Sequence, residues 1–191
     1  VGPASAHLYD KKPDRPYRGA MEILPRPQGV TVVNIVEVEP YLYGVVSMEM
    51  SPRYPAESLK AQAIAARTYA LKNVGRHADQ GFDLHDTVHC QVYGGYYSED
   101  PRSSQAVNET AGMVMTYNGK LIDAVYSSTC GGFTETAEEV WGNPVPYLVS
   151  VADFDGRQCA RPRDEAGWME YFKSARPLNC LQPSFAKTEA F

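Results

Sequence analysis

Two stretches near the start of the chain have the pattern of β-strands. In residues 29–39, β-branched residues alternate with polar neighbours, which is typical of a half-buried strand. A shorter strand is expected near 20–24, inside a proline-rich lead-in that covers residues 1–28. Because proline has no N–H to donate to a neighbouring strand, the rest of this lead-in is predicted to be extended chain.

The strongest helical pattern covers residues 55–77. Pro55 suits a first helical turn, Glu57 favours the positive end of the helix dipole, and the interior is rich in alanine. Small side chains on one face let a neighbouring backbone approach closely, so we expect this helix to be largely buried. That face, at helical spacing, carries Leu59, Ala63, Ala66 and Ala70.

A β-hairpin is predicted in the second half of the chain. Residues 112–117 and 120–127 have strand character and are joined by Asn118 and Gly119. Asn-Gly is a strong hairpin signal because both residues readily adopt the positive φ of a type I′ turn.

The second hairpin strand leads into a loop with two adjacent glycines, Gly131 and Gly132. They permit either a ligand-facing turn with exposed backbone N–H groups or a purely structural turn. A short helix is expected near 166–174. Together these elements predict one α+β domain, with antiparallel strands packed around the long central helix and a substrate cleft. Its motif-bearing core covers about 18–155, and a cysteine-containing tail covers 156–191.

The composition narrows the class of protein. The chain has 191 residues, 43% of them hydrophobic, and a net charge of -5, as in ordinary globular proteins. This mild acidity, without a cluster of Lys and Arg, argues against nucleic acid or an anionic membrane surface as the main partner. No run of roughly eighteen apolar residues predicts a transmembrane helix, and no signal peptide stands at the start.

The four cysteines are too few for a disulfide scaffold. Cys159 and Cys180 lie in a tail rich in Pro and Arg, and a disulfide between them would imply an oxidising compartment. Free thiols are the alternative.

Glu49 is the most informative single residue, because it lies within an apolar run at 43–52. A carboxylate in such surroundings either has an ion-pair or hydrogen-bond partner or takes part in catalysis. Partial burial would favour the protonated form, which a general acid needs near neutral pH. The alternative is an acid at a helix entrance that faces solvent or caps backbone N–H groups.

A second group of candidate residues combines imidazole and thiol side chains. His77, His85, His89 and Cys90 fall within fourteen residues. These side chains are the usual ligands of zinc, which prefers four of them in a tetrahedron. One alternative is an exposed His-rich loop. Another makes Cys90 a nucleophile with a histidine base, although the sequence supplies no third, orienting group.

Several ordered motifs resemble the bacterial stage II sporulation protein D family, whose relatives include proteins called amidase enhancers. The resemblance runs from about residue 18 to residue 155. It is carried by residues 40–50, 54–71, 89–94, 124–135, 140–142 and 146–148. Members of this family are lytic transglycosylases of peptidoglycan. The resemblance therefore implies cleavage of the β-1,4 bond between N-acetylmuramic acid and N-acetylglucosamine in denuded glycan strands, with a 1,6-anhydro product.

The resemblance implies that Glu49 is the catalytic acid and base. One carboxylate suffices in such an enzyme because the C6 hydroxyl of the substrate is the nucleophile, whereas ordinary glycosidases need a second carboxylate. The nearby acids Glu135, Glu138 and Glu139 lie in a polar run and are expected to be solvated. The substrate cleft is expected between Glu49 and the loop at 128–132.

Residues expected to bind the saccharide lie on the central helix and around the glycine pair. For Lys60, the alternative to saccharide binding is a side chain that lies in solvent. Arg67, if buried, needs acceptors such as Glu49 or the carbonyls of the Gly-Gly loop. The full set is Lys60, Gln62, Arg67, Tyr69, Tyr93, Ser127, Ser128, Gly131, Gly132 and Thr134.

Some members of this family hold a structural zinc around the His-Cys-Gln motif. His85 stands where a cysteine is common, and this exchange keeps the ligand chemistry. We therefore expect a zinc site formed by His77, His85, His89 and Cys90. Peptidoglycan strands are the expected partner, at an extracytoplasmic location (periplasm, cell wall or intermembrane space) reached by a signal or anchor outside this sequence. The rivals are a non-catalytic glycan-binding module that stimulates a cell-wall amidase, and a zinc hydrolase.

Overall fold

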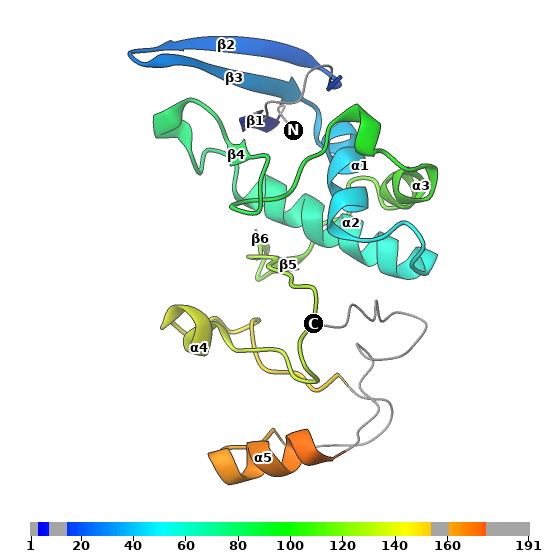
Figure 1. Cartoon of the computed structure of the whole chain (residues 1–191), viewed down its shortest axis with the longest axis vertical. Helices are drawn as coiled ribbons and strands as arrows, with labels where there is room; N and C mark the ends of the chain where they lie inside the picture. Colours follow the sequence, from blue (N-terminus) through cyan, green and yellow to red (C-terminus); the bar gives the residue numbers. More distant parts are fainter. Residues whose placement is uncertain (1–3, 8–14, 154–160, 175–191) are drawn as a thin grey trace. The chain divides into compact units, whose positions relative to one another are not determined.

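A computed structural model describes residues 4–7, 15–153 and 161–174 of the chain (Figure 1). The chain divides into two compact units, Val1–Val125 and Tyr126–Phe191. The division falls earlier than the boundary near residue 155 that the motifs suggested between core and tail. The predicted disulfide between Cys159 and Cys180 lies outside the described residues.

The first unit contains a four-stranded sheet with the strand order β2-β3-β1-β4. β3 pairs antiparallel with both β2 and β1, and β1 pairs parallel with β4. The two predicted strands are the hairpin β2–β3. The second ends at Val36 rather than residue 39, because a helix begins at Val38. The strands are β1 (Ala4–His7), β2 (Ala20–Arg26), β3 (Gly29–Val36) and β4 (Leu84–His85).

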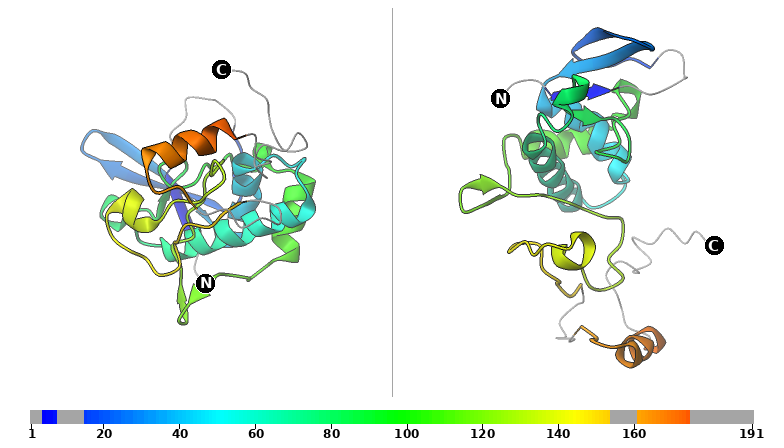
Figure 2. Two further views of the ribbon diagram at one scale, coloured as in Figure 1. Left: turned by 90° about the horizontal axis from the view of Figure 1, so that it is seen from below. Right: turned by 90° about the vertical axis from the view of Figure 1, so that its left-hand side faces the viewer.

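Three helices pack against one another in this unit (Figures 1 and 2). They are α1 (Val38–Glu49), α2 (Ala56–Lys72) and α3 (Pro101–Glu109). The predicted buried face of α2 is confirmed, since none of its four residues is more than 1% exposed. Val36 and Leu84 of the sheet join the same core. The core therefore fixes the helices against the strands that precede and follow them.

The central helix is shorter than the predicted span 55–77. It ends at Lys72, where the Asn73 backbone N–H and side-chain amide both donate to the Tyr69 carbonyl. His77 consequently lies beyond the helix, just before the short 3₁₀ helix η1 (Ala78–Gln80). This early end brings His77 into a turn that leads towards β4.

Tyr93 belongs to the chain that follows β4, and its ring packs into the core against α1. Its ring is 2% exposed and packs at centroid distances of 4.9 Å from Tyr41 and 5.8 Å from Tyr17. Its hydroxyl donates to Asn34 Oδ1 at 3.1 Å. Gly44 of α1 makes room for this ring, since a Cβ there would lie 2.7 Å from Tyr93 Cε2. The expected saccharide contact of Tyr93 is therefore corrected to a structural role.

The predicted Asn-Gly hairpin is present with shorter strands. β5 (Thr116–Tyr117) pairs with β6 (Lys120–Leu121), and Asn118 and Gly119 adopt φ angles of 49° and 74°. Another 3₁₀ helix, η2 (Tyr96–Ser98), packs on α1.

The second unit is built around two helices, α4 (Ala137–Trp141) and α5 (Glu165–Lys173). α4 begins with a capping box formed by Thr136 and Glu139. α5 confirms the helix expected near 166–174. Across both units, helices and small, mainly antiparallel sheets make up an α+β fold. Within the described residues, each helix is too short or too polar to cross a lipid bilayer.

Candidate active site and metal-binding cluster

Glu49 is the last residue of α1 and is half-buried. Its Oε1 accepts a hydrogen bond from the backbone N–H of Val92 at 2.8 Å. Among the described residues this is the only hydrogen bond of the carboxylate. One oxygen is thus held in place, and Oε2 remains available to exchange a proton with a bound molecule.

The segment that supplies this N–H is itself rigidly held. Gln91 is fully buried, donates through Nε2 to the Ala66 carbonyl at 3.2 Å, and accepts from the Tyr41 hydroxyl at 3.3 Å. These bonds tie the His-Cys-Gln segment to α2 and α1. The position of the Glu49 carboxylate is therefore set by the packing of two helices, not by a surface loop.

Tyr69 of α2 is the predicted saccharide-binding residue that the structure brings near Glu49. Its hydroxyl accepts from Arg76 Nη1 at 2.9 Å. Burial raises the pKa of Tyr69, with additional contributions from the charges of Cys90 and Glu49 and opposition from Arg76. The phenol therefore stays protonated at neutral pH and can act as a hydrogen-bond donor.

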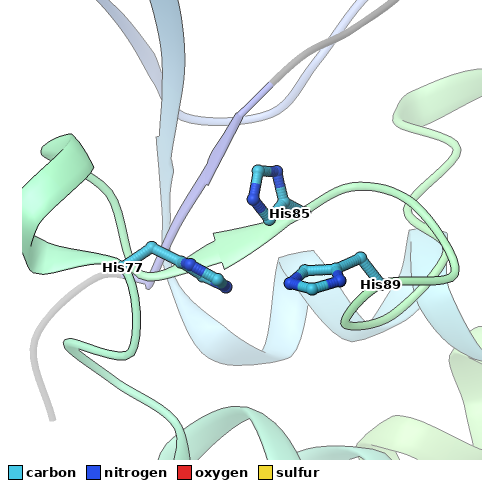
Figure 3. A group of neighbouring side chains, drawn as sticks. All are labelled: His77, His85 and His89. Atoms are coloured by element: carbon cyan, nitrogen blue, oxygen red, sulfur yellow. The ribbon is translucent and has the colours of Figure 1, made fainter.

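Three histidines converge beside this segment. Figure 3 shows the rings of His77, His85 and His89 turned towards one another, and their ligand atoms all lie within 4.8 Å of one another. Cys90 Sγ lies 3.4 Å from His77 Nε2. Burial and the neighbouring charges of His89 and Arg76 lower the pKa of His77, which favours the neutral imidazole that a metal requires.

The donor types suit a zinc ion, and the three histidines already converge, while Cys90 adjoins this group through its contact with His77. In tetrahedral zinc sites the ligand atoms lie roughly 3.3–3.6 Å apart, as follows from metal–ligand bonds of about 2.0–2.3 Å. The His77–Cys90 separation falls in this range, and the three imidazoles need only a small inward movement. The residues come from the turn after α2, from β4 and from the loop after it, so one ion could hold these segments together.

Two of the other residues on α2 do not lie with this group. Lys60 forms surface ion pairs with Glu57 at 2.9 Å and Glu109 at 2.8 Å, which raise its pKa. Gln62 is 8% exposed, and its Nε2 has no hydrogen-bond partner among the described residues. Within the described residues, neither side chain contacts the Glu49 carboxylate.

Arg67 is a structural residue. Its side chain is 1% exposed and forms a bidentate ion pair with Glu39, at 2.8 Å and 2.7 Å. It also donates to the carbonyls of Val107 and Met113, both at 3.1 Å. The expected acceptors, Glu49 or the Gly-Gly loop, were wrong. With every guanidinium nitrogen engaged and buried, Arg67 has no surface to offer a saccharide.

The remaining predicted saccharide contacts belong to the second unit. Thr134 Oγ1 donates to the Val149 carbonyl and accepts from the Val151 N–H. The Gly131 carbonyl accepts from the Tyr171 hydroxyl at 3.0 Å. The cleft expected between Glu49 and this loop stays a prediction, since its two sides lie in different units. The loop residues are Ser127, Ser128, Gly131, Gly132 and Thr134.

Arg76 and the Val92 N–H were missed by sequence analysis. Arg76 lies in the turn beyond the end of α2, directly before His77. Helical spacing therefore gave no signal for its hydrogen bond to Tyr69. The Val92 N–H could not be predicted as a partner of Glu49, because every residue except proline has a backbone N–H.

The fold and this arrangement define a small α+β protein with one anchored glutamate beside an imidazole–thiol cluster. Residues 26–117 match the family model SpoIID, stage II sporulation protein. The resemblance to the SpoIID family that the motifs predicted is confirmed over this segment. The matched segment includes Glu49 and all four candidate metal ligands and ends before the second unit begins.

Individual relatives agree with this assignment. The chain is 42% identical over 136 residues to an uncharacterized protein of Brachyspira hyodysenteriae, covering 71% of this chain and 37% of the relative. It is 46% identical over 112 residues to the amidase enhancer of Bacillus subtilis, covering 59% and 15%. Stage II sporulation protein D of Bacillus subtilis is 37% identical over 134 residues, covering 62% and 39%. The chain thus spans less than two fifths of the length of each relative.

Proposed function

We propose that the protein is a peptidoglycan lytic transglycosylase in which Glu49 is the general acid and base. The observation that carries this proposal is the asymmetric environment of the carboxylate. Val92 N–H holds Oε1, while Oε2 has no partner among the described residues. A half-buried carboxylate with one fixed and one available oxygen suits a group that gives and takes back a proton.

The proposed reaction needs no second carboxylate. Protonated Glu49 donates its proton to the glycosidic oxygen as the bond from C1 of N-acetylmuramic acid to that oxygen breaks. The C6 hydroxyl of the same ring attacks C1, and its proton passes to the Glu49 carboxylate. The products are a strand with a free 4-hydroxyl and a strand with a 1,6-anhydro end. Water is not consumed, and Glu49 ends in its starting state.

Tyr69 is the proposed saccharide donor beside Glu49. It remains protonated at neutral pH, and Arg76 holds its ring position through the hydroxyl. A hydroxyl fixed in this way can donate to an acceptor on the sugar without first losing conformational freedom. Its place within electrostatic reach of Glu49 supports a contact with the ring that is cleaved.

A structural zinc is also proposed, held by His77, His85, His89 and Cys90. The ion would join the turn after α2 to β4 and to the loop that leads to Val92. Its chemistry there is that of a crosslink, because four protein ligands leave no open coordination position for a substrate. Through this loop the metal would keep the Val92 N–H in position for Glu49.

The first test is the substitution Glu49→Gln. Glutamine can still accept the Val92 hydrogen bond but cannot donate the catalytic proton, so cleavage of denuded glycan should fall by at least about 10³-fold. Binding of the same strands and the melting temperature should change little. Glu57→Gln, at an exposed acid of α2, is the matched control and should keep wild-type turnover. Equal turnover in both variants would remove Glu49 from the mechanism.

A second candidate function is a non-catalytic glycan-binding module that stimulates a cell-wall amidase. It is favoured by the similarity to the protein named amidase enhancer. Either function places the protein outside the cytoplasmic membrane, with glycan strands as partner. Strand binding without any cleavage by the wild-type protein, together with stimulation of an added amidase, would support this candidate over the transglycosylase.

A further inference from the structure

The second unit contains a hollow that neither the family match nor the proposed reaction uses. Its volume is about 450 Å³, within the range of roughly 300–1,000 Å³ that is usual for small-ligand sites. The hollow is formed by the end of α4, the short stretch before α5 and α5 itself. Its lining residues are Glu139, Arg161, Pro162, Arg163 and Trp168.

An ion-pair network fixes one wall of the hollow. Arg161 donates to Glu135 at 2.5 Å and to Glu139 at 2.7 Å. Arg161, followed by the Thr136 hydroxyl, lowers the pKa of Glu139 to about 2, so this carboxylate is ionised at neutral pH. Glu139 therefore offers the hollow a hydrogen-bond acceptor whose position is set by the capping box of α4.

Two donors on the same hollow have no partner in the described part of the chain. Arg163 is exposed and makes no hydrogen bond or ion pair there, and the indole N–H of Trp168 is likewise unbonded. A guanidinium and an N–H donor that line one hollow favour a carboxylate ligand. The carboxylate of Glu139 adds an acceptor that suits hydroxyl groups.

An aromatic cluster holds Trp168 and connects the hollow to the glycine loop. Trp168 packs edge-to-face with Phe133 at 6.2 Å and with Tyr171 at 5.5 Å between ring centroids. Phe133 directly follows Gly132, and the Tyr171 hydroxyl donates to the Gly131 carbonyl. The hollow and the Gly-Gly loop are thus parts of one packed structure within the second unit.

We propose that this hollow is a second saccharide site that binds an N-acetylmuramic acid unit of a denuded glycan strand. A denuded unit carries a free lactyl carboxylate for Arg163 and the Trp168 N–H, and hydroxyl groups for Glu139. The identity of this ligand rests on the proposed function. In strands that keep their stem peptides, the lactyl group forms an amide bond and carries no negative charge. The site would therefore select strands from which the peptides have been removed.

The test compares two hexasaccharides of equal length. One alternates N-acetylglucosamine and N-acetylmuramic acid without peptides, and the other is chitohexaose, which has no lactyl carboxylate. Binding is measured by calorimetry on the whole chain carrying Glu49→Gln, so that neither probe is cleaved. Arg163→Gln should weaken binding of the muramic acid probe roughly tenfold, the effect of one charge-assisted hydrogen bond, and leave chitohexaose unchanged.

Matched variants separate this effect from general charge and folding effects. Arg53→Gln removes an exposed arginine of the first unit and should affect neither probe. Trp168→Ala should weaken binding of the muramic acid probe, whereas Met169→Ala, at an exposed neighbour on α5, should not. If Trp168→Ala lowers the melting temperature sharply, its binding data are set aside. The comparison of Arg163→Gln with Arg53→Gln, both at exposed residues, is then the test.

The outcomes also separate this inference from the proposed function. An Arg163→Gln effect in a protein whose wild type cleaves nothing supports the second site and refutes only the transglycosylase. Wild-type cleavage with equal affinities for Arg163→Gln and Arg53→Gln refutes only the second site. Displacement of the muramic acid probe by free stem peptide at equal concentration would show that the hollow binds peptide carboxylates, and would overturn the saccharide assignment.

Discussion

Glu49 and Arg67 are both charged residues in apolar sequence surroundings, yet their environments differ in kind. Arg67 makes four hydrogen bonds through its three nitrogens and is 1% exposed. Glu49 makes one hydrogen bond with the described residues and is half-buried. Full satisfaction is the mark of a residue that stabilises the fold, whereas an available oxygen at a fixed carboxylate is the mark of a residue that can react.

The substitution Arg67→Leu tests the structural assignment. It leaves the Glu39 carboxylate and the carbonyls of Val107 and Met113 without their donor in a poorly hydrated region. The free energy of unfolding should fall by about 3 kcal/mol or more, as measured by urea denaturation. Lys60→Gln, which removes a surface ion pair from the same helix, is the control and should change stability little. A stable Arg67→Leu variant with lost glycan affinity would instead restore Arg67 as a saccharide ligand.

The sequence predicted that these two residues are unusual but not what they contact. Arg67 was expected to need acceptors because it lies in an alanine-rich, buried helix. Its partner Glu39 lies 28 residues away, and only the packing of α1 on α2 brings them together. The half-burial expected of Glu49 is observed. The group that holds its carboxylate is the backbone N–H of Val92, which cannot be predicted from the residue type.

At the scale of elements, α1 is positioned by a close contact with the chain after β4. Gly44 lies against the Tyr93 ring, and the Gly94 N–H donates to the Gly44 carbonyl at 3.1 Å. This contact runs beside the one that holds Glu49, since Val92 is in the same segment. The geometry of the acid therefore depends on how closely one helix approaches one strand-like segment.

Gly44→Ala tests that dependence. In an ordinary helix interior this change stabilises by roughly 1 kcal/mol, because alanine is the better helix former. Here the added Cβ would lie 2.7 Å from a buried tyrosine ring, so we expect a net loss of about 1–3 kcal/mol in thermal or urea unfolding. Increased stability of the variant would show that α1 and Tyr93 are not in close contact.

Element prediction succeeded where local signals were strong. α2 was predicted from its helix formers, β3 from alternation, and the β5–β6 turn from Asn-Gly, whereas the pairing of β2 with β3 came from the structure. α1 was missed, because an apolar run of its length is compatible with strand or helix and its helical state depends on burial. β1 and β4 were missed because short strands are defined by their pairing partners, not by their own sequence.

At the scale of the whole molecule, the proposed zinc couples metal content to stability. Purified protein should contain roughly one zinc per chain, and chelation should lower the melting temperature, because the ion binds only the folded arrangement of its ligands. Cys90→Ser should reduce zinc content, whereas Cys130→Ser, at the cysteine that contacts Asp153 in the second unit, should not. Metal-free protein of unchanged stability would reject the site. Lost activity at unchanged melting temperature would favour a zinc hydrolase.

Lytic transglycosylation and hydrolysis of the glycan differ in the chemical nature of the new chain end. Denuded glycan strands are digested with the wild-type protein in ¹⁸O-labelled water, and the products are analysed by mass spectrometry. With the C6 hydroxyl as nucleophile, the new muramic acid ends should be 1,6-anhydro, one water lighter than hydrolytic ends, and free of ¹⁸O. New reducing ends of hydrolytic mass, absent from undigested strands kept in the same water, would contradict this mechanism, because they would show that water attacks C1.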